Sequence, residues 1–389
     1  MSGLEFMGYR RKDGSVGVRN HLLVVSAVSC ANHVARRIAE QVKNAVSITH
    51  PYGCGHIGED FLRVWGTLSG LGANPNVAGV LVVGLGCENV TASLIAGEIA
   101  KTGKPVEWIN IQDEGGSLKA VQRGCELLVE MAGDALDVER EPCGLNELVL
   151  GTECGGSDAT SGLASNPAVG VVADIVVDAG GTVILPESSE WIGAEHILAS
   201  RAVNSEVAKK CYDAVEYYVK RAMELGIDFR GAQPTPGNIA GGITTIEEKS
   251  LGTICKAGSR PVQDVLGYGE KPKGKGLYLM NEPGLDIESI TGLAAAGCQV
   301  IIFTTGRGTP AGSPVSPVVK VTANKETFNK MRCDIDVDVS SIIEGEETIE
   351  DAGRRILNEV LMVASGKPTK SELIGNMEVA ILRAAKYMF

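Results

Sequence analysis

The sequence predicts an α/β protein with two units, each built around a parallel sheet. Three observations support this fold class. Short runs of Val, Ile and Leu alternate with longer amphipathic stretches, glycine is frequent at 49 residues, and aromatic residues make up only 4% of the chain. Such alternation is typical of β–α units, because strands buried on both faces are apolar throughout. With 389 residues, the chain can form two complete cores.

The first unit is predicted over residues 1–135 and the second over residues 147–389. Between them the segment DALDVEREPCGLN is charged, contains Pro and Gly and has no periodicity, so residues 136–146 are interpreted as a linker. The strands expected in the first unit are His21–Val28, Ala45–Thr49, Val77–Val83 and Val106–Ile109, with a helix over Ala31–Val42. Those expected in the second unit are Leu148–Gly151, Thr182–Leu185, Gly276–Met280 and Gln299–Thr304, with helices over Asn166–Asp178, Asn204–Leu225 and Ile349–Ala364.

Composition narrows the class of protein. Lys and Arg total 36 against 48 Asp and Glu, a net charge of −12, which argues against a nucleic-acid binder. An anionic substrate would need a local site of Arg, Lys, helix N-termini or metal that overrides this charge. The N-terminal residues have no apolar core typical of a signal or anchor, and the longest apolar runs fall short of the roughly 20 residues that span a bilayer. We therefore expect a cytoplasmic protein without membrane association.

Three cysteines occur in the same context, a Gly-rich loop after a predicted strand. They are Cys54 in PYGCGH, Cys87 in GLGCE and Cys154 in GTECGGSD. The ten cysteines of a cytoplasmic chain are more plausibly thiols or metal ligands than disulfides. One interpretation is that these three bind iron, either as a single Fe²⁺ ion or as an iron–sulfur cluster with one open coordination position. The alternative is that a small thiol simply fits beside a tight glycine turn.

The loop around Cys154 also carries polar groups. Its Gly-Gly pair exposes backbone N–H groups, while Ser157 and Asp158 are candidate catalytic residues. A nucleotide site is a weaker interpretation, because the chain has no GxxxxGK[ST] motif and no GxGxxG in a dinucleotide-binding context.

Two further loops supply candidate acid–base groups. Glu195 and His196 follow the strand Thr182–Leu185 and are candidates for proton transfer, with Arg201 one turn later for a carboxylate. The alternative is an ordinary charged helix start. Lys249, in a long loop rich in Gly and Pro, is either a general base with a tuned pKa or a helix-start charge.

The loop after the strand Gln299–Thr304 is a candidate anion clamp. Arg307 lies in a Gly-Thr loop, and its planar fork of donors suits a carboxylate or sulfonate, with Thr304 as a second substrate-binding candidate.

Six motifs in order resemble the altronate/galactarate dehydratase family, which also includes the β subunit of (2R)-sulfolactate sulfo-lyase. They are GYRRKDGSVGVRN, HPYGCG, GLGCE, GTECGGSDATSG, QPTPGN with GGITTIEEKSLG, and FTTGRGTPAGSPVSPVVKV. The resemblance implies a Rossmann-like catalytic domain preceded by a smaller dimerisation domain that contributes the Cys54 and Cys87 loops. It also implies iron dependence and a homodimeric core.

The chain starts almost directly at the first motif, whereas the dehydratases of the family usually carry a small β-clip domain before it. The resemblance therefore implies a separate small β-clip (alpha) subunit as partner. It favours a carbon–sulfur lyase acting on a small anionic 2-hydroxy acid, which eliminates sulfite from (2R)-3-sulfolactate to give pyruvate. The alternatives are an iron-dependent sugar-acid dehydratase, a carbon–oxygen lyase, and a non-catalytic metabolite-binding subunit on the same fold.

Overall fold

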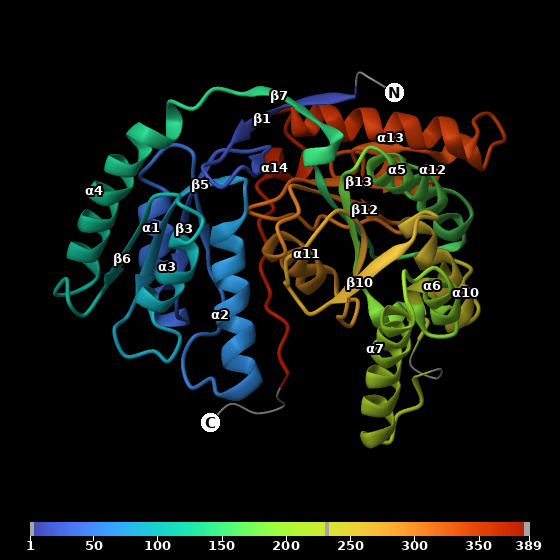
Figure 1. Cartoon of the computed structure of the whole chain (residues 1–389), viewed down its shortest axis with the longest axis horizontal. Helices are drawn as coiled ribbons and strands as arrows, with labels where there is room; N and C mark the ends of the chain where they lie inside the picture. The colour runs from blue at the N-terminus through green and yellow to red at the C-terminus, as the bar shows by residue number, and fades with distance from the viewer. Residues whose placement is uncertain (1–3, 230–232, 385–389) are drawn as a thin grey trace.

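The computed structural model describes residues 4–229 and 233–384 and contains two parallel sheets (Figure 1). A seven-stranded sheet has the order β10-β11-β9-β8-β12-β13-β14, and a four-stranded sheet has the order β4-β3-β5-β6. All strand pairs within both sheets are parallel. The predicted fold class, a Rossmann-like sheet domain preceded by a smaller α/β domain, is confirmed.

The seven-stranded sheet forms the larger domain. Its strands are β8 (Val149–Cys154), β9 (Thr182–Leu185), β10 (Val262–Leu266), β11 (Gly276–Met280), β12 (Val300–Thr304), β13 (Val318–Thr322) and β14 (Val337–Asp338). Alternate residues along a strand point to opposite faces, so Val300 and Ile302 join one core while Ile301 and Phe303 join another. Helices α5 (Asn166–Asp178) and α13 (Ile349–Ala364) pack on the first face and α11 (Asp286–Ala295) on the second.

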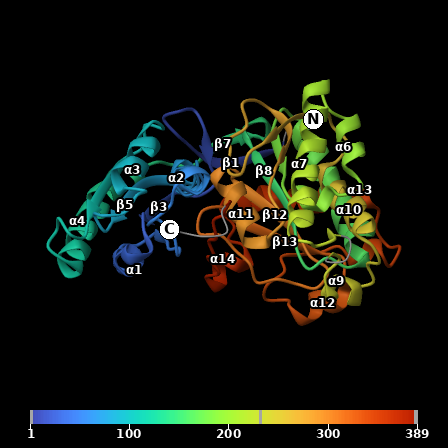
Figure 2. The ribbon, with the colours of Figure 1, turned by 90° about the horizontal axis from the view of Figure 1, so that it is seen from below.

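The remaining helices of this domain surround the carboxyl ends of its strands or close its edges (Figure 2). They are α6 (Glu195–Ser200), α7 (Ser205–Glu224), α9 (Pro236–Ala240), α10 (Ile246–Ile254), α12 (Lys325–Lys330) and α14 (Lys370–Ile374).

The four-stranded sheet forms the smaller domain. Its strands are β3 (His21–Ser26), β4 (Ala45–Ile48), β5 (Val77–Gly84) and β6 (Val106–Asn110). Helices α2 (Gly58–Ala73) and α3 (Ala92–Ala100) cover one face, and α1 (Asn32–Ala39) and α4 (Ser117–Leu136) cover the other. Both faces are covered, as parallel sheets require.

A third, antiparallel sheet joins the two domains. It shows that the prediction of an irregular linker is partly wrong. Strand β1 (Glu5–Arg10) pairs with β2 (Val16–Gly17) and with β7 (Glu141–Gly144), so part of the segment 136–146 is a strand. Its local sequence shows no strand pattern because the pairing partner lies more than 130 residues away. Phe6 and Cys143 belong to the core of the larger domain.

The first residues of the chain therefore pack with the larger domain although they precede the smaller one. Arg19 makes this connection with its guanidinium, which donates to the Val363 and Lys367 carbonyls at 2.8 and 2.9 Å and pairs with Glu372 at 2.7 Å.

The two domains are in direct contact along α2 and α11. Asn74 Nδ2 donates to the carbonyls of Ala294 and Cys298 at 2.8 and 3.0 Å. At Gly70 the helices come so close that a Cβ atom would lie 2.6 Å from the Ala295 carbonyl oxygen. Among the helices within the described ranges, none combines the length and apolar character needed to cross a lipid bilayer.

Candidate functional site

The polar site of the larger domain lies at the carboxyl ends of β8 and β12. The chain leaves β8 toward β9 on one side, and β12 later inserts on the other side, so this is the topological switch point where open α/β sheets bind ligands. The loops that follow β8 and β12 are joined by two hydrogen bonds. Gly155 N donates to the Thr304 carbonyl at 3.1 Å, and Arg307 N donates to the Gly156 carbonyl at 2.9 Å. Gly156 has a φ of 59°, which only glycine adopts without cost.

A thiol and two carboxylates form a compact group at this point. Cys154 is the last residue of β8, and Glu187 and Glu190 follow β9. Cys154 Sγ lies 3.6 Å from Glu187 Oε1 and 3.7 Å from Glu190 Oε2. Glu187 has a left-handed backbone with a φ of 73°, and its N–H donates to Glu282 Oε1 at 2.6 Å. This unusual conformation turns the Glu187 carboxylate toward the thiol.

Two lysines compensate the two carboxylates. Lys256 Nζ pairs with Glu187, and both side chains are fully buried. Lys249 Nζ lies 2.7 Å from Glu190 Oε1, with 10% and 11% of the two side chains exposed. Burial lowers the pKa of Lys256, but the acidic groups around it, Cys154 and Glu187 first, outweigh burial and raise it overall. Lys256 is therefore an ammonium in the core of the site.

The buried acids of the site have raised pKa values. Burial raises the pKa of the Cys154 thiol to about 12 and that of Glu187 to about 7. Burial, followed by the charge of Glu187, also raises the pKa of Glu282 to about 8. Glu153 is fully buried, its carboxyl oxygens have no hydrogen-bond partner in the described chain, and burial raises its pKa well above the ordinary range. Burial therefore favours the neutral forms of the thiol and of Glu153.

The donor set fits a transition metal. Among the described residues, Cys154, Glu187 and Glu190 are the group of three His, Cys, Asp or Glu side chains whose ligand atoms all lie within 4.8 Å of one another. A thiolate with two carboxylates suits Fe²⁺ or another first-row divalent ion. A metal deprotonates a coordinating thiol, and such a cation would supply what the buried Cys154 thiol needs to ionise.

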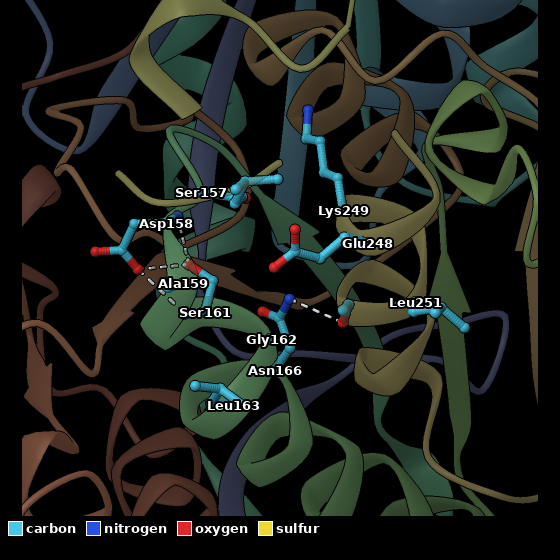
Figure 3. Close-up of a pocket in the computed structure, with 12 residues that line it drawn as sticks. Ser157, Asp158, Ala159, Ser161, Gly162, Leu163, Asn166, Glu248, Lys249 and Leu251 are labelled. Atoms are coloured by element: carbon cyan, nitrogen blue, oxygen red, sulfur yellow. Dashed lines mark hydrogen bonds between the residues drawn. The ribbon is translucent and has the colours of Figure 1, made fainter. Parts of the chain in front are cut away.

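A cavity of about 220 Å³ lies next to this group on the far side of Lys249. Figure 3 shows Asp158, Ser161 and Asn166 on one side of it, on the segment that leads into α5, and Glu248, Lys249 and Leu251 on the α10 side. Ser157 also lines the cavity. Because Lys249 contacts Glu190 and also lines the cavity, it connects the Cys154 group to a space that can hold a small ligand.

The three predicted iron cysteines do not form one group of ligand atoms within a single chain. Cys54 and Cys87 lie in the smaller domain and are exposed, whereas Cys154 is buried in the larger one. The loops of Cys54 and Cys87 do contact each other, since Gly55 N donates to Asn89 Oδ1 at 2.9 Å. In this structure, Cys154 therefore has carboxylates rather than thiols as its neighbours.

The predicted acid–base residues have different surroundings. Lys249 lies on α10, and its ammonium faces the site. The Glu195 carboxylate accepts the Gly193 N–H at 2.6 Å at the start of α6, and His196 is exposed on that helix. Arg201 donates to the Arg260 carbonyl at 2.7 Å. These contacts give Glu195 and Arg201 local structural roles, and neither they nor His196 line the cavity.

The remaining predicted residues hold the loops of the site. The Asp158 carboxylate accepts the Thr160 N–H at 2.9 Å and the Asn324 amide at 2.8 Å. The buried Thr304 hydroxyl donates to Asn166 Oδ1 at 2.6 Å. Arg307 is exposed in the loop joined to Gly156, so its guanidinium is accessible to a ligand.

Sequence reasoning missed the two carboxylates and Lys256. Glu187 and Glu190 belong to the segment PESSEWIGAEH, in which Glu195 and His196 are the predicted acid–base residues. The position of Glu187 directly after a buried strand was the available signal. Lys256 offers no such signal, because a lysine after a helix is normally a surface residue.

Comparisons with known proteins agree with the motifs. Residues 145–387 match the family model for the C-terminal part of D-galactarate/altronate dehydratase, and residues 8–136 match the second domain of D-galactarate dehydratase/altronate hydrolase. The chain is 38% identical to the (2R)-sulfolactate sulfo-lyase subunit beta of Chromohalobacter salexigens, with 98% of each chain aligned.

Two dehydratases are similarly related. The altronate dehydratase of Bacillus subtilis is 37% identical over 97% of this chain and 78% of its own length. The galactarate dehydratase (L-threo-forming) of Escherichia coli is 37% identical over 94% of this chain and 74% of its own length. The fold, the site and these matches define an α/β enzyme of the lyase class. The chain belongs to the D-galactarate/altronate dehydratase family, as the motifs indicated.

Proposed function

We propose that this chain is the large subunit of a lyase that eliminates sulfite from (2R)-3-sulfolactate to give pyruvate. The observation that carries the proposal is the alignment with a sulfo-lyase subunit over 98% of both chains at 38% identity. The dehydratase relatives align equally well but over 74–78% of their length. The compact site also supports a small substrate, because the cavity lined by Lys249 has a volume of about 220 Å³.

The reaction requires that a proton leaves C2 and that the C3–S bond breaks with both electrons going to sulfite. The resulting enol then takes a proton at C3 and becomes pyruvate. The main demand is stabilisation of the enolate-like transition state. A metal held by Cys154, Glu187 and Glu190, iron by family resemblance, would supply Lewis-acid stabilisation of oxygen atoms of the substrate.

The protein groups take the remaining roles. Lys249 is proposed as the proton-transfer group, since its side chain lines the cavity and its ammonium contacts Glu190. Arg307 is proposed to bind the carboxylate or sulfonate, because its guanidinium is exposed beside Gly156 at the switch point. Ser157 lines the cavity and is available to hydrogen-bond the substrate.

A partner subunit is part of the proposal. The sulfo-lyase relative is itself a subunit by name. We propose that the active enzyme combines this chain with a small β-clip subunit around a homodimeric core in the cytoplasm.

The decisive experiment incubates the chain, with its partner subunit and Fe²⁺, with (2R)-3-sulfolactate and separately with altronate and galactarate. The proposal expects sulfite and pyruvate in equal amounts from the first substrate. Formation of a 2-keto-3-deoxy acid from a sugar acid, with no sulfite from sulfolactate, would instead identify a dehydratase. Binding of these acids without any turnover would favour a non-catalytic subunit.

A further inference from the structure

Two neighbouring cavities lie where the two domains meet, away from the Cys154 site. One has a volume of about 110 Å³ and the other about 370 Å³, and Asp13 and Ser15 line both. Val149 and Thr182, the first residues of β8 and β9, line the larger cavity, and so does the segment 271–275 just before β11. The larger cavity therefore lies at the amino ends of β8 and β9, whose carboxyl ends carry the proposed catalytic site, and the smaller cavity adjoins it on the side of the smaller domain.

The linings of these cavities are strongly cationic although the chain has a net charge of −12. The smaller cavity is lined by Arg10, Arg11, Lys12 and Lys104, and the larger by Lys271, Lys273 and Lys275. Asp13 is the one acidic residue in either lining, and its carboxylate accepts hydrogen bonds from Ser15 N and Oγ at 3.0 and 2.6 Å. Of the seven cations, Arg10 is paired with Glu141 and Glu147. The other six form no ion pair within 4.0 Å in the described part of the chain, although Lys273 lies near Asp264 and Lys275 near Glu147.

Arg11 and Lys104 are held in place by uncharged oxygen atoms rather than by carboxylates. Arg11 donates to the carbonyls of Pro75 and Arg19 at 2.6 and 2.8 Å and to Asn20 Oδ1 at 2.7 Å. Lys104 Nζ donates to the carbonyls of Gly72 and Asn74 at 2.9 and 2.8 Å. An arginine has five N–H donors and a lysine three, so both retain donors for a ligand.

Lys271, Lys273 and Lys275 extend this charge from the larger domain. They lie in the loop KPKGKG, and in the described chain none of the three makes a hydrogen bond or an ion pair within 4.0 Å. Burial, followed by the neighbouring charges of Arg11 and Lys271, lowers the pKa of Lys104 well below its ordinary value. Burial also lowers the pKa of Lys271. The cations of the two domains thus repel one another across the domain junction.

We propose that the two cavities form a binding site for a small polyanion, a metabolite with two or more phosphate or carboxylate groups. The ligand bridges Arg11 and Lys104 of the smaller cavity to Lys271 and Lys273 of the larger one. This site is separate from the catalytic cavity, with which it shares no lining residue. Because its cations come from both domains, the bound anion stabilises the domain arrangement and raises the melting temperature.

The test titrates the purified full-length chain with inorganic pyrophosphate, with citrate and with monovalent acetate at constant ionic strength, followed by calorimetry and thermal melting. We expect pyrophosphate or citrate, but not acetate, to bind and raise the Tm. Preference for pyrophosphate identifies a phosphate ligand, and preference for citrate a polycarboxylate. The variant Lys271→Ala/Lys273→Ala, which changes exposed side chains, is expected to weaken binding at least about 10-fold.

The matched control is Lys43→Ala/Lys119→Ala, which removes the same charge from exposed positions in the smaller domain. It should bind the anion as the unchanged chain does. Equal affinity in the loop variant and the unchanged chain, an equal loss in the control, or no binding of either polyanion would overturn the proposal.

Discussion

Lys256 and Glu187 form an ion pair in which neither side chain is accessible to solvent. Removing one partner of such a pair leaves an uncompensated buried charge, which typically costs about 3–5 kcal/mol. We expect Lys256→Met to lower the free energy of unfolding by that amount in urea titrations. The control is Lys320→Met, since Lys320 is also fully buried but donates to the Pro310 and Ala311 carbonyls. A loss no larger than that of the control would contradict an ionic role for Lys256.

Substitution of Cys154 tests the metal group. Serine keeps the size of the side chain but binds a soft metal more weakly, so Cys154→Ser should lose bound iron and most of the activity together. Cys298→Ser is the control, because Cys298 is equally buried but belongs to the apolar core under α11. Metal analysis and turnover of both variants provide the measurement.

The same analysis of Cys87→Ser tests the prediction that this exposed cysteine is an iron ligand. Unchanged iron and activity would remove Cys87 from the site. Unchanged iron in Cys154→Ser would instead refute the group of Cys154, Glu187 and Glu190.

His50 should make the stability of the smaller domain depend on pH. Burial lowers its pKa to about 4 from an unfolded value of 6.5, and its two ring nitrogens lie 2.7 Å from the Ser26 carbonyl oxygen and 3.1 Å from Tyr52 N. The unfolded chain therefore binds the additional proton between pH 6.5 and 4. The contribution of His50 to stability is complete above pH 6.5 and is lost as the pH falls toward 4.

The lost stability amounts to at most about 3 kcal/mol. Urea midpoints of the unchanged chain and of His50→Gln should be measured at several pH values. Their comparison separates the pH dependence caused by His50 from the pH dependence caused by the carboxylates. The difference between the two curves should shrink on acidification. A constant difference from pH 7 to pH 4 would exclude the effect.

Two glycines of α2 provide a matched test of the domain contact. A Cβ atom at Gly70 would lie 2.6 Å from the Ala295 carbonyl oxygen, whereas one at Gly66 would meet no atom within 4 Å. Gly66→Ala should stabilise the helix by about 0.5–1 kcal/mol, and Gly70→Ala should be destabilising despite the same gain in helix propensity. Thermal melting measures both, and an equal rise in Tm would show that α2 and α11 do not pack this closely.

The helices and strands that the sequence could predict are those whose pattern is contained within their own residues. Strands Thr182–Leu185 and Gly276–Met280 and helices Asn166–Asp178 and Ile349–Ala364 have the predicted boundaries. Their apolar runs or helical spacing lie between clear turn residues. Strand β7 was missed because its partner β1 is distant in sequence and because Pro142 and Gly144 are typical of loops.

The site could be predicted only in outline. The glycine loop after β8 identified Cys154, and the ionisable loop residues identified Lys249. The carboxylates of Glu187 and Glu190 became neighbours of the thiol through the left-handed turn at Glu187, which no sequence pattern indicates. The burial of Lys256 could not be predicted either, because it depends on pairing with Glu187, which is distant in sequence.

The position of β1 has a consequence for synthesis of the chain. Phe6 is buried against the larger domain, and Arg19 donates to the Val363 carbonyl, 344 residues later. A nascent chain emerging from the ribosome can complete β3–β6 early, but its first segment stays without its final neighbours until almost the entire polypeptide has been translated. That segment is thus among the last to be fully packed, although it is made before either domain is complete.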